Sequence, residues 1–562
     1  FGRIRVLAGP DHLPATANKR KLHDKNGRFA GVYFHKPFWP ATFSATQGLD
    51  ENTGRSLDDW QTFYEAGTRL VEYLRHTGYG GAVVCVATEG SAMYPSQHLA
   101  PNPKFDTGVF FTTGQDPIRK DVVELLMRLF ERESLTLIPA IELSAPLPEL
   151  ESLRRRSTNP SLFLHNGSHA WQQHGAGWKG MMPPYNPLDP DVQTAVTNVM
   201  QELTTRYEQH PSFGGIAWLV GGQGMGLFPG SEWGRDIHTW QQFQAEVQEE
   251  PAEDTSDKPL SQAQWLQWRS KKLMEFHRHI QRTISSPDDP KRLWIMTADL
   301  FAEDNVKESM RPELLAATDF RQQMLRWGLD PQRYRDEEHI LMVQPKRQAP
   351  PFDPASFATS YQQRTQQWDN LFQGYRVPGV LFFHEPLWRA LPSFDELSPF
   401  GSDRTQLTVF SHLAQPDILA RQRFVQSLAA ADSQYFFDGG WGIPLGNELA
   451  LRPLLETWQS LPAKTFQDVS SKQQGAADSE VTIRTLHENE YTYMYLVNSA
   501  PWPVETSLTL QYPDGATIEV LGPHEGPTVS KPSGQQNWQI KLDPCGLYAV
   551  RLNTPSFRVL SW

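Results

Sequence analysis

The sequence predicts an α/β protein, a (β/α)8 barrel of the TIM type with a C-terminal antiparallel β-sandwich. Eight short apolar runs recur between residues 31 and 437, and amphipathic segments follow several of them. The runs are continuous rather than alternating, which is typical of parallel strands buried on both faces. After residue 463 the pattern changes to short β-rich runs separated by turns, which predicts the second fold.

We expect each apolar run to form one barrel strand. The predicted strands are 31–34, 82–86, 135–141, 215–220, 293–297, 340–343, 379–383 and 434–437. Helical periodicity predicts helices at 57–75, 116–133, 189–209 and 260–284. A doubly wound sheet is the alternative, but no glycine-rich phosphate loop follows the first strand.

The domain division follows from the same patterns. We expect an N-terminal extension or linker at 1–29, the barrel at 30–462 and the sandwich at 463–562. The sandwich begins with a polar stretch, after which runs such as 491–497 and 547–552 alternate with turns. We interpret this domain as a structural companion, unless Trp502 or Trp538 belongs to an exposed aromatic strip that binds ligand.

Composition excludes several classes of partner. The formal net charge of -12 argues against a nucleic acid, and no apolar run approaches the roughly 20 residues that span a bilayer. The two cysteines, Cys85 and Cys545, fall in different predicted domains, so we expect no disulfide between them.

Chemistry in such a barrel sits at the C-terminal ends of the strands. Carboxylates there suit glycosidic cleavage, which needs one carboxylic acid to protonate the leaving oxygen and one carboxylate as nucleophile or base. The catalytic candidates at these positions are Glu385, Glu142, Asp438 and Asp299. Each has an alternative interpretation as a helix cap or a structural carboxylate.

Glu385 is the strongest of the four candidates. It closes the seventh apolar run and is flanked by His384 and Trp388. The alternative is an ion pair with Arg389 or Lys346, which would make Glu385 structural.

Amide, aromatic and other polar side chains at the same strand ends are candidates for holding sugar hydroxyls or stacking on rings. The substrate-binding candidates are Trp39, Glu89, Tyr94, Gln223, Gln344, His384, Trp388 and Trp441. Gln223 follows the fourth strand and cannot ionise, so it cannot be the acid. His165, His169 and His174 lie in a long loop without helical pattern, and we expect neither a metal site nor a cofactor.

Several segments have the character of motifs found in known barrel domains. They are 31–34, 92–96, 185–192 and 213–216, together with the Trp-x-x-Trp-Arg pattern that begins at Trp265. In these motifs the chain resembles glycosyl-hydrolase-like family 10, a group of barrel domains, and the likeness covers about residues 30–460. The resemblance implies a glycoside hydrolase barrel that acts on a poly- or oligosaccharide without a cofactor.

One departure from related barrels concerns the fourth strand. The resemblance implies an acid/base on strand four and a nucleophile on strand seven, where Glu385 stands, but residues 217–223 contain no acid. Glu232 lies farther along that loop and is one substitute; Glu142 or Asp438, with inverting geometry, is another.

Three functions stay open at this point. The first is a glycoside hydrolase, which we expect to be secreted or periplasmic because of its substrate. The second is a catalytically silent barrel that binds carbohydrate or scaffolds a larger protein. The third is a barrel enzyme of other chemistry, such as a lyase or a metal-dependent hydrolase.

Overall fold

The structure is a computed structural model, and it describes most of the chain. The described residues are 27–37, 39–43, 60–101, 120–156, 159–169, 185–221, 224–249, 261–298, 300, 319–348, 367–384, 387–391, 406–410, 417–470, 481–530 and 536–562. All structural statements below refer to these residues.

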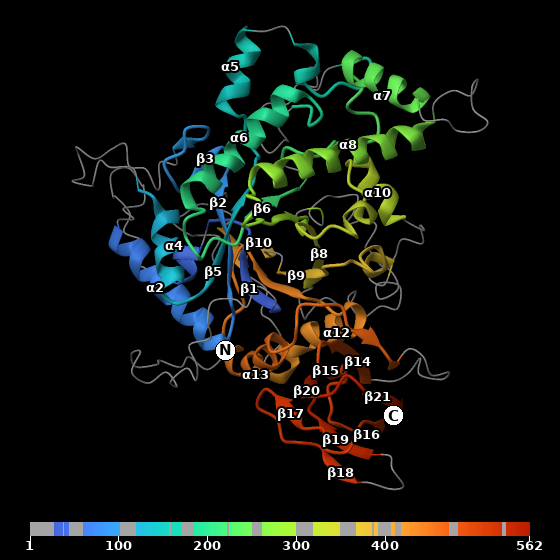
Figure 1. The fold of residues 1–562 in the computed structure, drawn as a ribbon. Coiled ribbons are helices and arrows are strands. Elements are labelled where there is room, and N and C mark those ends of the chain that lie inside the picture. The colour runs from blue at the N-terminus through green and yellow to red at the C-terminus, as the bar shows by residue number, and fades with distance from the viewer. Residues whose placement is uncertain are drawn as a thin grey trace.

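Eight parallel strands close into a barrel (Figure 1). They are β1 (Phe29–Phe34), β2 (Gly81–Thr88), β5 (Thr136–Ile141), β6 (Ile216–Leu219), β7 (Leu293–Met296), β8 (Ile340–Gln348), β9 (Gly379–His384) and β12 (Tyr435–Gly440). Closure is complete because β1 pairs in parallel with both β2 and β12. The predicted (β/α)8 barrel is confirmed, and each predicted strand overlaps an observed one.

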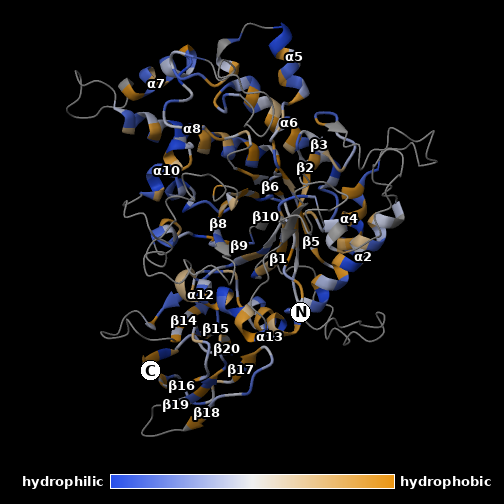
Figure 2. Ribbon diagram, turned by 180° about the vertical axis from the view of Figure 1, so that it is seen from behind, coloured by the Kyte–Doolittle hydropathy of each residue, from blue (hydrophilic) through white to orange (hydrophobic). Residues whose placement is uncertain are grey.

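Helices surround the barrel, and in Figure 2 they are striped with hydrophobic and hydrophilic residues. The described helices are α1 (Trp39–Thr42), α2 (Trp60–Thr77), α4 (Val122–Arg132), α5 (Pro148–Arg156), α6 (Pro190–Tyr207), α7 (Ile237–Glu249), α8 (Gln262–Thr283), α10 (Phe320–Arg326), α12 (Gln422–Ala431) and α13 (Glu448–Gln459), with 3-10 turns η2 (Pro160–Leu162), η5 (Pro331–Tyr334) and η7 (Asp417–Arg421). None of them has both the length and the apolar character needed to cross a membrane.

The strands separate two apolar layers, because successive side chains along a strand point to opposite faces. One layer fills the barrel and includes Tyr33, Cys85, Ala140, Phe383 and Phe437. Their chain neighbours, such as the residues at positions 382 and 436, belong to the larger cluster between strands and helices. The position of a residue along its strand therefore decides whether it faces the interior or the helices.

Short strands extend the sheets around the barrel. Strand β3 (Ser91–Ala92) forms an antiparallel hairpin with the end of β2, and β4 (Ala100–Pro101) pairs in parallel with β3. Separately, β10 (Leu387–Leu391) pairs with β11 (Gln406–Phe410). Helices α5 and α7 lie above the C-terminal ends of the barrel strands, at the end remote from the C-terminal domain (Figure 1).

The C-terminal domain consists of two antiparallel sheets around one apolar core. Its strands are β13 (Gln467–Asp468), β14 (Val481–Glu488), β15 (Tyr491–Asn498), β16 (Val504–Gln511), β17 (Ile518–Leu521), β18 (Thr528–Ser530), β19 (Gln536–Leu542), β20 (Gly546–Leu552) and β21 (Arg558–Ser561). The predicted sandwich is thereby confirmed. The exact domain boundary at 462–463 stays a prediction.

The two aromatic candidates on this domain have different positions. Trp538 is fully buried and donates its indole N–H to Tyr512, whereas Trp502 is 53% exposed. The other exposed aromatic side chain among the described residues of the domain is Tyr491, at the start of β15, whereas Trp502 lies beyond the end of that strand. At about 3.3 Å per residue the two are at opposite ends of β15, so they form no continuous strip.

Before β6, His210 lies between two carboxylates: its Nε2 is 2.9 Å from Glu124 Oε2 and its Nδ1 is 3.0 Å from Glu131 Oε2. Burial alone would lower the pKa of His210, but the hydrogen bonds to both glutamates raise it above its usual value. The stabilisation from this cluster should be fully present below about pH 6.5, the usual pKa of histidine in an unfolded chain. It should be lost as the pH rises through the higher pKa of His210 in the folded protein.

We therefore expect His210→Gln to flatten this part of the pH dependence of stability. Thermal unfolding of wild type and variant between pH 5 and 9 measures it. The expectation fails if both proteins lose the same stability over that range.

Candidate active site

The ends of the first three barrel strands bring a carboxylate, an ammonium and a hydroxyl together. The Lys36 Nζ is 2.5 Å from Glu142 Oε2, and the Thr88 hydroxyl also donates to Glu142 Oε2. Glu142 is 5% exposed, so the ion pair is shielded from water. We call this group the mouth cluster.

Strand alternation explains why Glu142 faces the interior. Ile138 and Ala140 on β5 belong to the cluster inside the barrel, and Glu142 is the next residue of the same parity. Its backbone N–H donates to Ala87 O of β2, which continues the parallel pairing by one residue. Cys85 of β2 belongs to the same interior layer.

The charged groups at the mouth affect the pKa of the buried Cys85 thiol. Burial raises its pKa above the usual value, Glu142 and more weakly Glu89 raise it further, and Lys36 opposes them. Cys85 is therefore held as a neutral thiol, which is not nucleophilic. The carboxylates of Glu142 and Glu89 are therefore both close enough to the Cys85 sulfur to interact with it electrostatically.

His35 lies at the end of β1, beside the mouth cluster in sequence. Its Nδ1 is 2.7 Å from the Tyr33 hydroxyl, and its ring packs edge-on to Phe383 with centroids 5.6 Å apart. Tyr33 and Phe383 both belong to the interior layer. His35 and Lys36 are not among the site residues predicted from the sequence. Their position directly after the first predicted strand, 31–34, is the signal that could identify them.

Asp438 faces the helices rather than the mouth. Its Oδ1 accepts from His384 Nε2 at 2.8 Å, and its Oδ2 accepts from Arg423 Nη2 of α12 at 2.6 Å and from the Tyr79 hydroxyl at 3.1 Å. Burial would raise the pKa of Asp438, but the Arg423 charge and the His384 hydrogen bond hold it well below its usual range. Phe437, inside the barrel, is its neighbour of opposite parity.

These contacts do not support a catalytic role for Asp438. A carboxylate that is permanently ionised and used on both oxygens cannot donate a proton. His384 is likewise bound to Asp438 in the helix layer and not aligned with the interior residues. In the described geometry both side chains connect the strand ends to the helix layer.

Gln344 also faces outward. Leu341 and Val343 of β8 are interior residues, and Gln344 donates its side-chain amide to Asp369 at 2.6 Å. Lys346 reaches the same carboxylate at 3.2 Å. The proposed contact of Gln344 with substrate is therefore not supported, because its amide is occupied between strand and helix.

Two aromatic candidates are buried in the helix layer. Trp39 is fully buried, with its ring 6.2 Å from that of Phe63. Tyr94 is 3% exposed and packs edge-on against Tyr207 of α6. Neither presents a ring to a sugar. Trp441, which follows β12, is half-buried and remains a candidate for stacking.

Four candidates fall on residues whose placement is not described. Glu385, Asp299 and Gln223 lie outside the described residues, and the same holds for the side chain of Trp388. Their assignments stay predictions from the sequence.

Glu232 does not fold back over the mouth. Its loop is fixed to α8, because Arg269 donates to Gly230 O at 3.0 Å and to Trp233 O at 2.6 Å. Glu232 is exposed beside this anchor. The Trp-x-x-Trp-Arg pattern thus has a structural explanation: its arginine, fully buried, binds the carbonyls of the loop after strand four.

The segment that resembles the family motif at 185–192 serves to cap α6. Asp189 Oδ1 accepts from the backbone N–H groups of Asp191 and Val192, and Oδ2 accepts from Ser161 at 2.6 Å. Asn186 donates to Asp236 at 2.9 Å, which ties this segment to the start of α7. The motif is explained by helix capping and loop anchoring.

Within the described part of the chain, no group of three or more His, Cys, Asp or Glu side chains is arranged to hold a metal ion. His165 Nδ1 accepts from the Gly167 backbone, and His169 N–H donates to Asn166. These two histidines make local loop contacts, while His174 lies outside the described residues.

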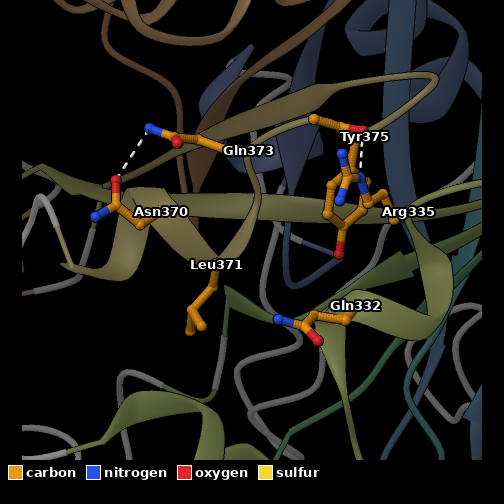
Figure 3. A pocket seen from close by; sticks show the side chains of 7 residues that line it. Gln332, Arg335, Asn370, Leu371, Gln373 and Tyr375 are labelled. Carbon is orange, nitrogen blue, oxygen red and sulfur yellow. Dashed lines mark hydrogen bonds between the residues drawn. The ribbon is translucent and has the colours of Figure 1, made fainter.

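A surface hollow of about 420 Å³ lies at the other end of the barrel (Figure 3). It is lined by Gln332, Arg335, Asn370, Leu371, Gln373, Gly374 and Tyr375. These residues precede β8 and β9 and so lie at the N-terminal ends of the strands. The hollow is separate from the mouth, and Arg335 donates to Gly374 O across it at 2.8 Å.

The comparisons with known proteins agree with this fold. Residues 58–291 match the family model Glycosyl hydrolase-like 10, so the predicted resemblance is confirmed over that span, which contains β2, β5 and β6. The chain is thus a (β/α)8 barrel with an additional C-terminal β domain, and its residues 58–291 are glycosyl hydrolase-like. A search of curated proteins found no match.

Solved glycoside hydrolases align over nearly the whole chain. The family 30 subfamily 8 xylanase Xyn30A from Clostridium acetobutylicum is 8% identical, with a TM-score of 0.36 over 95% of this chain and 99% of the xylanase. The Nostoc punctiforme debranching enzyme is 11% identical, with a TM-score of 0.40 over 94% and 99% of the two chains. Identities and TM-scores this low identify no activity.

Proposed function

We propose that the protein hydrolyses glycosidic bonds of a poly- or oligosaccharide at the barrel mouth. The observation that carries this proposal is Glu142, a buried carboxylate at the mouth of a barrel that is partly glycosyl hydrolase-like in sequence. Active sites of this fold lie at that end. The expected location, secreted or periplasmic, follows from such a substrate and stays part of the proposal.

The two oxygens of the Glu142 carboxylate have different surroundings. Lys36 and Thr88 both engage Oε2, and Oε1 makes no hydrogen bond with any described residue. Oε1 is therefore available to activate water or to attack an anomeric carbon. The sequence also predicts Glu385 as nucleophile or base, and one experiment separates the two residues.

We expect the wild-type protein to release reducing ends from at least one member of a glycan library. Glu142→Gln should lower kcat by about 10²–10⁴-fold because the variant removes the base but keeps the shape. Glu385→Gln, assayed in parallel, shows whether strand seven supplies the nucleophile. Glu232→Gln is the matched control, since Glu232 is exposed at the same end of the barrel.

The alternative is a silent barrel that binds carbohydrate. It is favoured by the ion pair with Lys36, which would also suit a purely structural Glu142, and by the acid-free residues 217–221. Glycan binding without hydrolysis, unchanged in both glutamine variants, would establish this alternative. Hydrolysis that disappears with either variant eliminates it.

A further inference from the structure

The tip of strand two carries a glutamate in an unusual backbone position. Thr88 of β2 pairs with Ser91 of β3, and the two residues between them, Glu89 and Gly90, have φ values of 52° and 78°. Two-residue hairpin turns with positive φ at both positions favour Asn-Gly. A glutamate is not a residue that this turn prefers, and such departures gather at functional sites.

The turn lies at the mouth beside Glu142. The Glu89 backbone N–H donates to Ser144 Oγ at 3.2 Å, and Ser144 is two residues beyond Glu142. Gly90 packs closely on the same loop, because a Cβ at this position would lie 2.9 Å from the Cβ of Ala145. Glu89 and Glu142 therefore project from adjacent strand ends that are held together by direct contacts.

The two carboxylates have different environments. Glu142 is buried and ion-paired to Lys36, whereas Glu89 is exposed and makes no side-chain hydrogen bond or ion pair with any described residue. The exposed carboxyl group of Glu89 is accessible to a sugar chain that binds over the turn. Pairs of carboxyl groups in contrasting environments commonly divide the acid and base roles.

We propose that Glu89 is the proton donor of the hydrolysis proposed above, on which this inference rests. As the glycosidic C–O bond breaks, the proton of the Glu89 carboxylic acid goes to the leaving oxygen. The oxygen of a water molecule, or first a nucleophilic carboxylate, bonds to the anomeric carbon. The proton lost by water goes to the base, and solvent restores the proton of Glu89.

Three other carboxylates considered for the site do not fit the donor role. Asp438 is turned into the helix layer and held ionised by Arg423. Glu232 is anchored over α8 by its loop. Glu142 is committed to Lys36.

The test compares two leaving groups in Glu89→Gln and Glu89→Asn. Hydrolysis of the natural glycan should fall by about 10²–10⁴-fold. A 2,4-dinitrophenyl glycoside of the same sugar needs no proton donor, so its bond cleavage should stay within about tenfold of wild type. In both Glu89 variants, the pH–rate profile measured with the glycan as substrate should also lose its alkaline limb.

The asparagine variant separates catalysis from structure. Asparagine suits this turn better than glutamate, so Glu89→Asn should raise Tm while it removes hydrolysis of the glycan. A purely structural Glu89 predicts that Glu89→Asn retains full activity.

Wild-type rates on the glycan in both Glu89 variants, together with loss of activity in Glu142→Gln, would overturn this inference and leave the hydrolase proposal intact. A wild-type protein that hydrolyses no glycan and no dinitrophenyl glycoside would overturn both.

Discussion

Asp432→Asn is expected to lower the free energy of unfolding by about 3–5 kcal/mol, because it leaves the Arg28 guanidinium buried without its counter-charge. Arg28 Nη2 is 2.7 Å from Asp432 Oδ1, and the two side chains are 0% and 3% exposed. Denaturant unfolding at pH 7 measures this loss.

The pair joins the barrel to the C-terminal domain. Asp432 follows α12, Tyr495 of β15 donates to Asp432 Oδ1 at 2.6 Å, and the Phe466 N–H donates to Oδ2 at 2.7 Å. Arg28, just before β1, lies over the Phe466 ring at 5.0 Å from its centroid. We infer that barrel and sandwich unfold together, so the loss should appear in a single transition.

The backbone of Asp432 provides a matched comparison. Its φ is 48°, in the left-handed region that asparagine tolerates better than alanine. Asp432→Ala should therefore cost about 1–2 kcal/mol more than Asp432→Asn. Glu456→Gln, which breaks the partly exposed pair with Arg452, is the control and should cost about 0–1 kcal/mol.

A different result would change the interpretation. A loss below about 1 kcal/mol in Asp432→Asn would show that the buried charge is compensated elsewhere. Two separate transitions would show that the sandwich is an independent folding unit.

The fold could be predicted because its signals are local. Each barrel strand is an apolar run that is buried on both faces, and such runs, as at 82–86 and 379–383, stand out in the sequence. Helix starts were less exact. Residues 116–119 of the helix expected at 116–133 lie outside the described residues, and α4 begins at Val122 with Asp121 as its cap.

The site was harder to predict because a strand end alone does not fix the direction of a side chain. Asp438 and Gln344 directly follow the predicted strands 434–437 and 340–343, but both lie inside the longer observed strands and are of outward parity. Phe437 and Val343 point into the barrel, so the next residue along each strand points outward. The sequence alone does not show which residues point inward. Which alternate set of side chains points inward depends on how all eight strands close the barrel. The sequence of one strand does not contain this information.

Long-range packing decided the aromatic candidates. Trp39 and Tyr94 follow strands one and two, yet helices cover them, because Trp39 packs against Phe63 of α2 and Tyr94 against Tyr207 of α6. The role of Lys36 also depends on a long-range contact that the local sequence does not show. Lys36 becomes part of the site only because the end of β5 places Glu142 beside it.

Asp438 offers the second large effect, and it separates structure from catalysis. Asp438→Asn should lower the free energy of unfolding by about 3–5 kcal/mol, because an amide cannot neutralise Arg423 and directs N–H groups at a donor. Arg423 Nη2 is 2.6 Å from Asp438 Oδ2, and Asp438 is 2% exposed.

The loss should depend on pH in a defined direction. The pKa of Asp438 is lowered on folding, so its contribution to stability is present above the usual value of about 3.9 and is lost as pH falls toward the folded value. The asparagine variant lacks this dependence. Its unfolding free energy should therefore approach that of wild type as the medium is acidified below pH 4.

Activity decides between the two roles. Because the Asp438 carboxylate faces α12 and not the mouth, the folded fraction of Asp438→Asn should keep a kcat within a few-fold of wild type, measured at a temperature well below its Tm. Arg423→Met, which leaves Asp438 buried without its cation, should show the same separation of stability from kcat. A stable Asp438→Asn protein with kcat reduced 10²-fold or more would instead restore Asp438 to the catalytic candidates.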